Sequence, residues 1–381
     1  MVVMNIKLNN FLLFDDFELC MAYPKKPVHT TIENEFLEGR PNFRYKKLVI
    51  LMGANATGKT ALGRILMAIF NFITNQEYKM ITKLIENKSK EAGFELDIAF
   101  KNHMLYRITT KIKAKEPGSS DYNSSDISVE VRSESILLND NYERCVARLM
   151  KKSIVADDSY ITELEKVPRL SWNFEFTLDY DGAQRAIEPE DPVLYASVLQ
   201  ETLKILDPRI VQVDKIPQTE NTYLILYKND SVLIDNGKCV DRIKLSSGTV
   251  EGINLAEMIT SMKLRSMDFY YCDEKFSHIN SDVEKAFLSL FVDLLGPNQQ
   301  LFFTSHNSDI LEMDFPNHTY AFLRRDETDE NHISCVYASD YIKKNNISLK
   351  NAVDNDMFSS VPDVSRIFEL KEIKTERAAN E

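Results

Sequence analysis

A glycine-rich stretch that follows an apolar run is the first place in this chain where residue types and spacing indicate chemistry. Residues 48–52 read LVILM, and Gly53 is followed after four residues by Gly58, Lys59 and Thr60. Helical apolar spacing comes next, and strand, loop and helix in this order are typical of a phosphate-binding loop. Glycines let backbone N–H groups turn toward a phosphate, and the helix start adds its positive end. We expect Lys59 to reach the β- and γ-phosphates of a nucleotide, and the Thr60 hydroxyl to hold Mg²⁺.

Nine consecutive residues form this predicted nucleotide-binding loop. They are Gly53, Ala54, Asn55, Ala56, Thr57, Gly58, Lys59, Thr60 and Ala61. The alternative is an ordinary loop between a strand and a helix that binds no phosphate. In that case both the full pattern and its context would have arisen by chance.

Two adjacent carboxylates end a second apolar stretch, residues 267–274, which reads MDFYYCDE. If this stretch is a strand parallel to the first one, its last residues lie beside the phosphate loop. Asp273 is then placed to hold Mg²⁺ through water, and Glu274 to orient an attacking water, which are tasks that phosphoryl transfer needs. In isolation the same pattern describes a strand that runs into a solvated loop, and the phosphate loop upstream is what favours the catalytic interpretation.

A histidine and a helix start complete the candidate residues. Residues 299–306 contain a further apolar strand pattern that ends in His306, whose imidazole can hydrogen-bond a γ-phosphate or position water. A packed or surface histidine is the alternative. Ser246, Ser247 and Gly248 precede a helical pattern and offer hydroxyl groups and free N–H donors at its start. Taken alone, these three residues are simply a good helix start.

The elements that must position these residues mix strand and helix patterns. Strands are predicted within residues 4–20, 94–100, 104–113 and 127–138, and in three segments between 210 and 235. Helices are predicted in residues 60–74, 77–92, 141–152, 157–165 and 191–206, the last with Asp191 as its cap and Pro192 at its first position. Loops are predicted in residues 24–45 and 114–126. No heptad stretch is present, and the 183 residues between Thr60 and Lys244 mix helix and strand patterns, which leaves no room for a long coiled-coil arm.

The composition is ordinary for a globular protein and bounds the function. The 381 residues are 44% hydrophobic and 27% charged, enough for one large domain or two modest ones. A net charge of −12 disfavours a stand-alone nucleic-acid or membrane-surface binder, although 46 Lys and Arg allow a local basic surface. The five cysteines are widely spaced without a C-x-x-C pair, and no apolar run is long enough to cross a membrane. We therefore expect a cytoplasmic protein.

Together these stretches resemble the ABC-type ATPase heads of the SMC and RecF kind. In that family the phosphate loop is followed, much later, by a signature L-S-x-G-[ETQ], a strand ending in Asp-Glu, a D-loop and a strand ending in a switch histidine. The matching stretches here are residues 53–60, 245–249, 268–274, 277–280 and 304–306. The pattern around Asn10 and Phe11 resembles the opening strands of the family.

Two further features resemble a bacterial subgroup of compact ATPases found in anti-phage abortive-infection and toxin–antitoxin-like operons. The loop reads GANATGKT, with Ala56 where the larger family has glycine, and a polar C-terminal region contains Val361, Pro362 and Asp363. The sequence also departs from the family pattern. Ser247 stands where many relatives have glycine, and Asn280 where the D-loop usually has Asp or His. The family's Q-loop glutamine, which couples the metal to lobe motion, has no clear counterpart; Gln76 is a candidate.

The resemblance implies an α/β fold, a P-loop NTPase of the ABC-ATPase head type in a single domain over residues 1–381. Lobe I, with a mixed β structure and the phosphate loop, is expected in residues 1–140, and a helical and strand insertion in residues 141–240. Lobe II, with a parallel sheet, the signature, the Asp-Glu strand and the switch histidine, is expected in residues 241–345. Residues 346–381 are a C-terminal segment.

The resemblance also implies a site shared between two molecules. Two heads would form a homodimer around two ATP molecules, and Ser246 and the Gly248 N–H of one head would cap the γ-phosphate bound by the other. Glu274, His306 and Lys59 would act in Mg²⁺-dependent hydrolysis of ATP to ADP and phosphate. Loss of the γ-phosphate would then open the dimer.

Two functions are consistent with this mechanism. In the first, the protein is an ATP-driven switch in anti-phage defence that controls a separate effector, a nuclease or toxin, because the head itself has no long arm or evident nuclease motif. In the second, it is a RecF- or SMC-like DNA repair or maintenance ATPase that clamps duplex DNA with a basic surface, formed by lysines 79, 83, 88, 90, 111, 113 and 115. Those lysines are otherwise ordinary solvated faces. A transporter ATPase would need a membrane partner, and the strands of lobe I fit it poorly.

Overall fold

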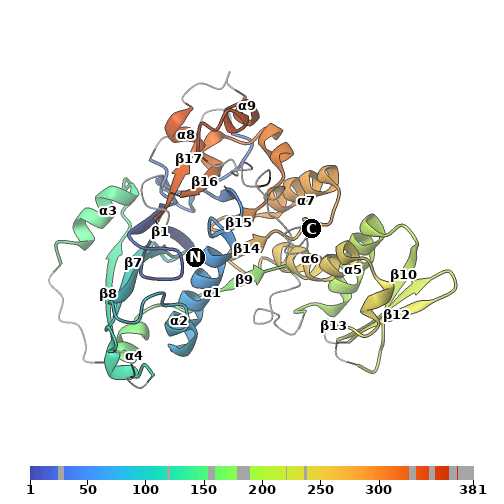
Figure 1. The fold of residues 1–381 in the computed structure, drawn as a ribbon, viewed down its shortest axis with the longest axis horizontal. Coiled ribbons are helices and arrows are strands. Elements are labelled where there is room, and N and C mark those ends of the chain that lie inside the picture. Colours follow the sequence, from blue (N-terminus) through green and yellow to red (C-terminus); the bar gives the residue numbers. More distant parts are fainter. Residues whose placement is uncertain are drawn as a thin grey trace, which may run out of the picture.

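The computed structural model shows a layered α/β fold (Figure 1). It describes residues 1–24, 30–116, 118, 121–152, 159–177, 189–219, 221–235, 238–325, 332–342, 348–359 and 367. The segment with Val361, Pro362 and Asp363 lies outside the described residues. Within the described part of the chain, no helix is both long and apolar enough to cross a membrane.

A six-stranded sheet forms the centre of the fold. Its strand order is β17 (Ile333–Tyr337), β16 (Tyr320–Arg325), β5 (Leu48–Met52), β15 (Gln300–Thr304), β14 (Phe269–Asp273) and β9 (Trp172–Glu175). The strands from β16 to β9 are parallel, and β17 is antiparallel to β16. Every residue of β5, β14 and β15 is buried, which explains their continuous apolar runs, because parallel strands are covered on both faces. The register pairs Leu51 with Thr304 and Thr304 with Asp273, so the carboxyl ends of these strands lie side by side.

One face of this sheet shares a hydrophobic core with helix α1 (Lys59–Asn75) and a second sheet. The second sheet is antiparallel and has the strand order β2 (Phe17–Cys20), β1 (Val2–Asn9), β6 (Ala92–Ala99), β7 (Met104–Ile112) and β8 (Ile127–Ser135). The side chains of β5 alternate between the two faces. Val49 and Leu51 belong to this core, whereas Leu48, Ile50 and Met52 belong to the core on the opposite face.

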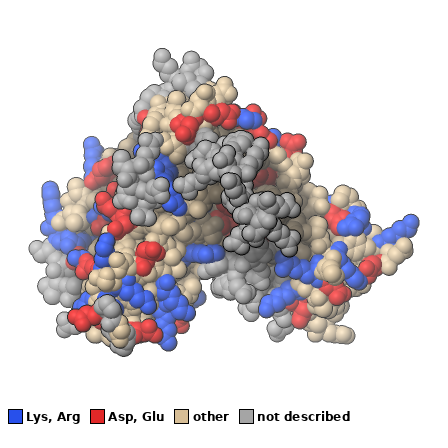
Figure 2. Space-filling model, viewed as in Figure 1, with Lys and Arg blue, Asp and Glu red and all other residues tan. Residues whose placement is uncertain are grey.

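Helices α6 (Ser247–Leu264) and α7 (Ser281–Leu294) contribute the core on that opposite face. Helix α5 (Pro192–Leu206) packs closely on α6, since a Cβ at Gly252 would lie only 2.5 Å from Leu206 Cδ1. After α5 comes an antiparallel sheet of β10 (Ile210–Lys215), β11 (Thr222–Tyr227), β12 (Ser231–Asp235) and β13 (Lys238–Cys239). This unit extends to the right in Figure 1. Acidic and basic side chains are interspersed on the face shown in Figure 2.

Short elements complete the described fold. They are β3 (Phe36–Leu37), β4 (Arg40–Arg44), α2 (Lys79–Thr82), α3 (Tyr142–Leu149), α4 (Tyr160–Leu164), α8 (Ala338–Tyr341) and α9 (Leu349–Asp354), with 3-10 turns at Ser124–Asp126, Arg242–Lys244, Ser308–Glu312 and Asn317–Thr319.

The structure confirms the α/β class and most of the predicted elements. The predicted strands correspond to β1, β2, β6, β7, β8, β10, β11 and β12, and the predicted helices to α1, α3, α4, α5 and α6. The predicted start of α5 is confirmed in detail. The Asp191 carboxylate accepts the N–H groups of Val193 and Leu194, both at 3.0 Å, and Pro192 is the first helical residue.

The helix predicted over residues 77–92 is wrong beyond its first turn. Helix α2 ends at Thr82, and residues 87–91 turn around the side chain of Asn10. The Asn10 amide donates to three carbonyl groups of that turn, at 2.8 to 3.3 Å, and its oxygen accepts the Asn87 N–H at 2.9 Å. A contact from a distant part of the chain therefore overrides the local helical spacing. Residues 24–45, predicted to be a loop, contain the short pair of β3 and β4.

Candidate nucleotide-binding site

The phosphate loop connects β5 to α1 and depends on two glycines with positive φ. Gly53 has φ 151° and Gly58 has φ 99°. A Cβ at Gly53 would lie 2.5 Å from the carbonyl oxygen of Leu323 in β16, and a Cβ at Gly58 would lie 2.8 Å from the Phe14 ring. Ala56 has φ 60°, so alanine occupies a position that favours glycine at the cost of backbone strain.

The remaining loop residues shape the turn. The Thr57 hydroxyl donates to the Ala54 carbonyl at 2.8 Å, and the Thr57 N–H donates to the same oxygen at 3.4 Å. Asn55 and Ala56 are exposed at the tip of the loop, and Ala61 lies in the first turn of α1. The loop therefore has a fixed shape with its tip open to solvent.

Gly53→Ala is expected to disrupt the loop and abolish nucleotide binding. The new Cβ collides with a backbone carbonyl, and the positive φ of 151° adds about 1–3 kcal/mol of strain for an L-residue. Thermal melting and the binding of a fluorescent ATP analogue measure the two effects. Gly39→Ala is the matched control, because Gly39 also has a positive φ, 73°, but its Cβ would meet only the end of the His103 side chain, at 3.2 Å. Equal behaviour of the two variants would contradict the importance of the close approach to β16.

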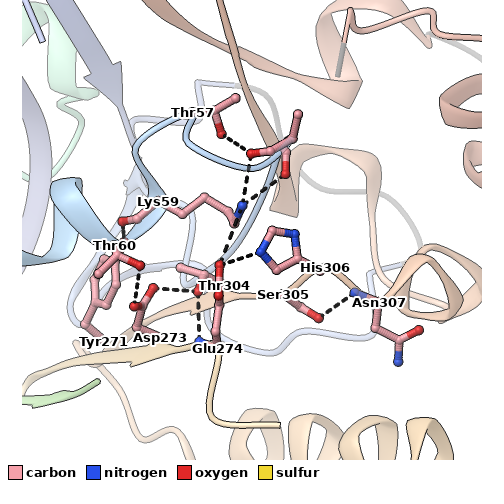
Figure 3. A network of polar contacts seen from close by, with 12 residues as sticks. Thr57, Lys59, Thr60, Tyr271, Asp273, Glu274, Thr304, Ser305, His306 and Asn307 are labelled. Atoms are coloured by element: carbon pink, nitrogen blue, oxygen red, sulfur yellow. Dashed lines mark hydrogen bonds and ion pairs between the residues drawn. The ribbon is translucent and has the colours of Figure 1, made fainter. Parts of the chain in front are cut away.

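Lys59 is the first residue of α1, and its ammonium lies within the phosphate loop (Figure 3). Its Nζ donates to the carbonyl oxygens of Gly53 and Ala54, at 3.0 and 3.4 Å, and lies 3.6 Å from Glu274 Oε1. Only 4% of the residue is exposed, and burial lowers the pKa of the ammonium, although Glu274 and Asp273 oppose this. A buried ammonium held mainly by carbonyl oxygens is a suitable partner for phosphate oxygens.

Asp273, the last residue of β14, accepts hydrogen bonds from two threonines. The Thr60 hydroxyl donates to Oδ2 at 2.7 Å, and the Thr304 hydroxyl donates to Oδ1 at 2.8 Å. The residue is fully buried, and burial raises the pKa of its carboxyl group despite the two hydrogen bonds. A cation would relieve this cost, and a carboxylate beside a hydroxyl is the hard oxygen donor set that Mg²⁺ prefers.

The described residues contain no group of three or more His, Cys, Asp or Glu side chains that could hold a metal ion by themselves. Mg²⁺ commonly uses one or two carboxylates together with substrate phosphates and water. Thr60 and Asp273 fit that requirement.

Glu274 and His306 face each other beyond the ends of β14 and β15 (Figure 3). His306 Nε2 lies 2.8 Å from Glu274 Oε1, the same oxygen that faces Lys59. Burial raises the pKa of Glu274, but hydrogen bonds and charge from His306 and Lys59 outweigh it and hold that pKa below its usual value. The side chain is 24% exposed, so an ionised carboxylate is accessible to water, as a general base requires. Glu274 also has a strained φ of 49°.

Two supporting side chains were not predicted from the sequence. Thr304 donates to Asp273 and accepts the Glu274 N–H at 3.0 Å, so one hydroxyl connects both acids. The Tyr271 hydroxyl donates to the Lys59 carbonyl at 2.7 Å and ties β14 to the start of α1. Both residues are hydrogen-bonding side chains in buried strands, where such groups need partners, but Tyr270 and Gln300 in the same strands share that feature.

The loop that carries His306 is fastened to α7. The Ser305 hydroxyl donates to Glu284 Oε1 at 2.7 Å, and Asn307 Nδ2 donates to Glu284 Oε2 at 2.8 Å. Glu284 is buried, so its carboxylate holds both neighbours of His306 from within the helix. The sequence patterns did not indicate this contact either.

The predicted signature residues begin α6 but stand apart from the phosphate loop. Ser246 caps the helix, because its hydroxyl oxygen accepts the Thr249 N–H at 3.1 Å. Ser246 and Ser247 are exposed, whereas Gly248 packs on the predicted D-loop, where a Cβ would lie 3.3 Å from the His278 carbonyl. Among the described residues, no hydrogen bond or ion pair joins the three signature residues to the phosphate loop or to the side chains in contact with it.

Gln76 lies far from these groups. It is the C-terminal cap of α1, whose opposite end carries Lys59 and Thr60. At about 1.5 Å per residue, a helix of this length separates its two ends by roughly 25 Å. The structure therefore contradicts Gln76 as the glutamine that couples the metal site to lobe motion.

Solved structures with this arrangement of elements are heads of SMC proteins. An SMC head bound to the C-winged helix domain of ScpA matches 92% of this chain and 100% of its own, with a TM-score of 0.50 and 12% identity. A head with an extended coiled coil, bound to the C-terminal domain of ScpA from Pyrococcus furiosus, matches 93% of this chain and 98% of its own, with a TM-score of 0.50 and 10% identity. The chain has the fold of an SMC head.

A third solved structure, of the recombination mediator protein RecF in the RecFOR pathway, matches 88% of this chain and 98% of its own, at 8% identity and with a lower TM-score of 0.43. No family model matches the sequence, and no curated protein matches it. At identities of 10 and 12%, the likeness to SMC heads establishes the fold alone.

Proposed function

We propose that this SMC-head fold is an ATP-binding and ATP-hydrolysing switch. The observation that carries the proposal is the contact of Lys59 and His306 with one carboxylate oxygen of Glu274, beside the hydrogen bond from Thr60 to Asp273. All of these groups lie at the carboxyl ends of adjacent parallel strands, where α/β sheets bind ligands. A phosphate cradle, a metal-binding carboxylate and an ionised base are the parts that phosphoryl transfer to water needs.

Each side chain has a separate task in this proposal. Lys59 and the N–H groups of the loop bind the β- and γ-phosphates. Thr60 and Asp273 hold Mg²⁺, which when bound neutralises charge on the phosphates. Glu274 orients the attacking water and accepts its proton, and His306 keeps that carboxylate ionised and in place.

The proposal includes a head-to-head homodimer in which the signature of one chain completes the site of the other. Its support is that Ser246 and Ser247 are exposed at the start of α6, and that the described residues show no bond from this helix start to the phosphate loop of the same chain. The first turn of a helix has N–H groups without partners in the helix, and Ser246 and Gly248 stand at the first turn of α6. Such a helix start is a natural anion-binding surface. A twofold arrangement would place each such surface on the partner's γ-phosphate.

Assembly and turnover measured together test this function. The wild-type chain is expected to hydrolyse ATP only with Mg²⁺, and to change from monomer to dimer in light scattering when ATP is added and back when ATP is consumed. EDTA should stop turnover. A chain that binds no ATP, or that binds it without any turnover or change of mass, would overturn the proposal.

We propose further that the switch acts in the cytoplasm on a separate effector, a nuclease or toxin, in anti-phage defence. The support is the resemblance of the GANATGKT loop to that subgroup, and the example of an SMC head that binds a domain of another protein, ScpA. The longest described helix, α6, has only 18 residues and cannot serve as a long arm. Phage plating with and without the gene and its neighbour is the test. A neighbouring product that is toxic only when Glu274 is intact would support the switch.

DNA clamping is the second candidate function, and a basic surface favours it. The lysines at 79, 83, 88, 90, 111 and 113 are exposed. The Lys115 N–H donates to the Lys88 carbonyl at 2.7 Å, which brings the two groups of lysines together. Figure 2 shows basic side chains at the lower left, where Figure 1 has α2. ATP-dependent binding of duplex DNA that weakens steeply with salt would support this function, and absent or salt-insensitive binding would favour the switch.

The proposed role of Glu274 as a general base also predicts how ATPase activity depends on pH. A general base loses activity as the pH falls through its pKa, and the lowered pKa of Glu274 places that loss at low pH in the wild-type chain. His306→Ala removes a hydrogen bond and a positive charge, so the pKa of Glu274 rises and the acid limb of the kcat profile moves to higher pH. His306→Asn keeps a hydrogen-bond donor without the charge and is expected to move the limb less. An acid limb that stays fixed in both variants would exclude His306 from this role.

A further inference from the structure

Lys275, the residue after Glu274, is the centre of a buried charge cluster that the proposed hydrolysis does not use. Its side chain is 0% exposed, and its Nζ lies 2.7 Å from Glu251 Oε2 and 3.7 Å from Glu175 Oε2. The side chains of these two glutamates are also nearly buried, at 3% and 11% exposed. Charges so far from water persist in a fold only when partners of opposite charge are held in place.

Two carboxylates face one ammonium in this cluster. Burial raises the pKa of Glu175 to about 7, although Lys275 opposes the rise. Without Lys275, two buried carboxylates would be left facing each other. Buried ion clusters add little stability over an apolar replacement, and their best attested use is to fix one arrangement of the elements that carry them.

The three charges belong to three segments that carry candidate site residues or lie beside them. Glu251 lies on α6, one turn after Ser247, in the helix that the signature residues begin. Lys275 directly follows the proposed base Glu274. Glu175 ends β9, which pairs with β14.

Strand β9 also connects to the phosphate loop. Phe176, the residue after Glu175, stacks on Tyr271 with ring centroids 6.3 Å apart. The Tyr271 hydroxyl donates to the Lys59 carbonyl. The cluster therefore stands between the phosphate loop, the proposed base and the signature helix of one chain.

We propose that Lys275 is a positioning residue that couples the hydrolytic side chains of a chain to its own signature helix. By binding Glu251 it holds the start of α6 in a fixed relation to Glu274, and by facing Glu175 it extends the link to β9. The inference rests on the proposed function, because the position of α6 acts on hydrolysis only if its start closes the site of a second copy. A nucleotide bound in one chain thereby sets the helix start that this chain offers to its partner.

A charge-neutral triple variant tests the coupling. Lys275→Met, Glu251→Gln and Glu175→Gln together remove all three charges of the cluster at similar side-chain volume. We expect this variant to bind ATPγS within about twofold of wild type, while kcat falls roughly 10- to 100-fold. Lys275→Arg keeps the charge and is expected to retain a large part of kcat. Wild-type kcat in the triple variant would overturn the proposal.

Hydrogen exchange separates a failure of this coupling from a failure of the proposed function. In full-length Ser246→Arg protein, which cannot close a partner's site, ATPγS is expected to slow amide exchange at the start of α6 when Lys275 is present. The same protein with the triple substitution should show no such change. An unchanged α6 with Lys275 present would overturn the coupling, even in a chain that hydrolyses ATP. If ATPγS slows exchange at α6 in a chain that neither hydrolyses ATP nor dimerises, the proposed function is overturned. The same result would support the coupling between Lys275 and α6.

Discussion

Glu274→Gln is expected to bind ATP with near-normal affinity, to turn over about 10²- to 10⁴-fold more slowly, and to accumulate as an ATP-bound dimer. The loss follows from the position of the carboxylate. Glu274 Oε1 receives Lys59 from one side and His306 from the other, and these groups keep it ionised, as a base for water must be. An amide has nearly the same shape and still accepts a hydrogen bond from His306, but it cannot take a proton.

Binding is expected to survive because the phosphate contacts belong to other residues. Lys59 and the N–H groups of the loop do not change, and Asp273 keeps its hydrogen bonds from Thr60 and Thr304. The measurements are ATP affinity by fluorescence, turnover by phosphate release and mass by light scattering. Glu77→Gln is the matched control, since Glu77 is an exposed carboxylate outside the candidate site. Normal turnover in Glu274→Gln would remove Glu274 from its proposed role.

The phosphate loop and the strands around it were predictable because their signals are local. The apolar runs of β5, β14 and β15 are nearly unbroken. At their carboxyl ends, β14 finishes in Asp273, β15 finishes in Thr304, and β5 leads into the glycine-rich loop. Burial on both faces of a parallel sheet imposes that pattern on each strand separately. Strand β9 was not predicted, because the alternation of Trp172 and Phe174 is too short to be distinctive in a strand that lies at the sheet edge and is only partly buried.

The contacts that organise the site were not predictable in the same way. Lys275 is 24 residues from Glu251 in the sequence and still farther from Glu175. Neither ion pair leaves a periodic pattern in the sequence. Glu284 and Asn307 meet in the same fashion. A motif identifies residues that act on a ligand through their types and spacing, whereas these side chains act on other side chains and become visible only when the strands are in register.

Mixing Lys59→Ala with Ser246→Arg subunits is expected to restore ATPase activity that each variant lacks alone. The structure separates the two positions within one chain, because Lys59 lies in the phosphate loop and Ser246 caps α6 with no bond between the two segments in the described residues. If a site is built from the loop of one chain and the signature of another, the mixed dimer has one site with both defects and one site with none.

The size of the recovery follows from the statistics of pairing. At equal mixing about half of the dimers are mixed, and each has one intact site of two, so activity should reach roughly a quarter of the wild-type value if the sites act independently. Ser246→Arg also removes a helix cap worth about 1 kcal/mol, an effect that thermal melting of the single variant measures separately.

A second mixture distinguishes a shared site from a general rescue by dimerisation. Lys59→Ala and Glu274→Gln both damage the side of the site that a chain supplies through its own β5, α1 and β14, so no pairing of these two variants yields an intact site. We expect no recovery in that mixture at any ratio. Recovery in both mixtures would mean that dimer formation alone raises activity, and recovery in neither would mean that each chain hydrolyses ATP without the signature of another. Only recovery confined to the Lys59→Ala and Ser246→Arg mixture supports a site in which the start of α6 faces the phosphate loop of a second copy.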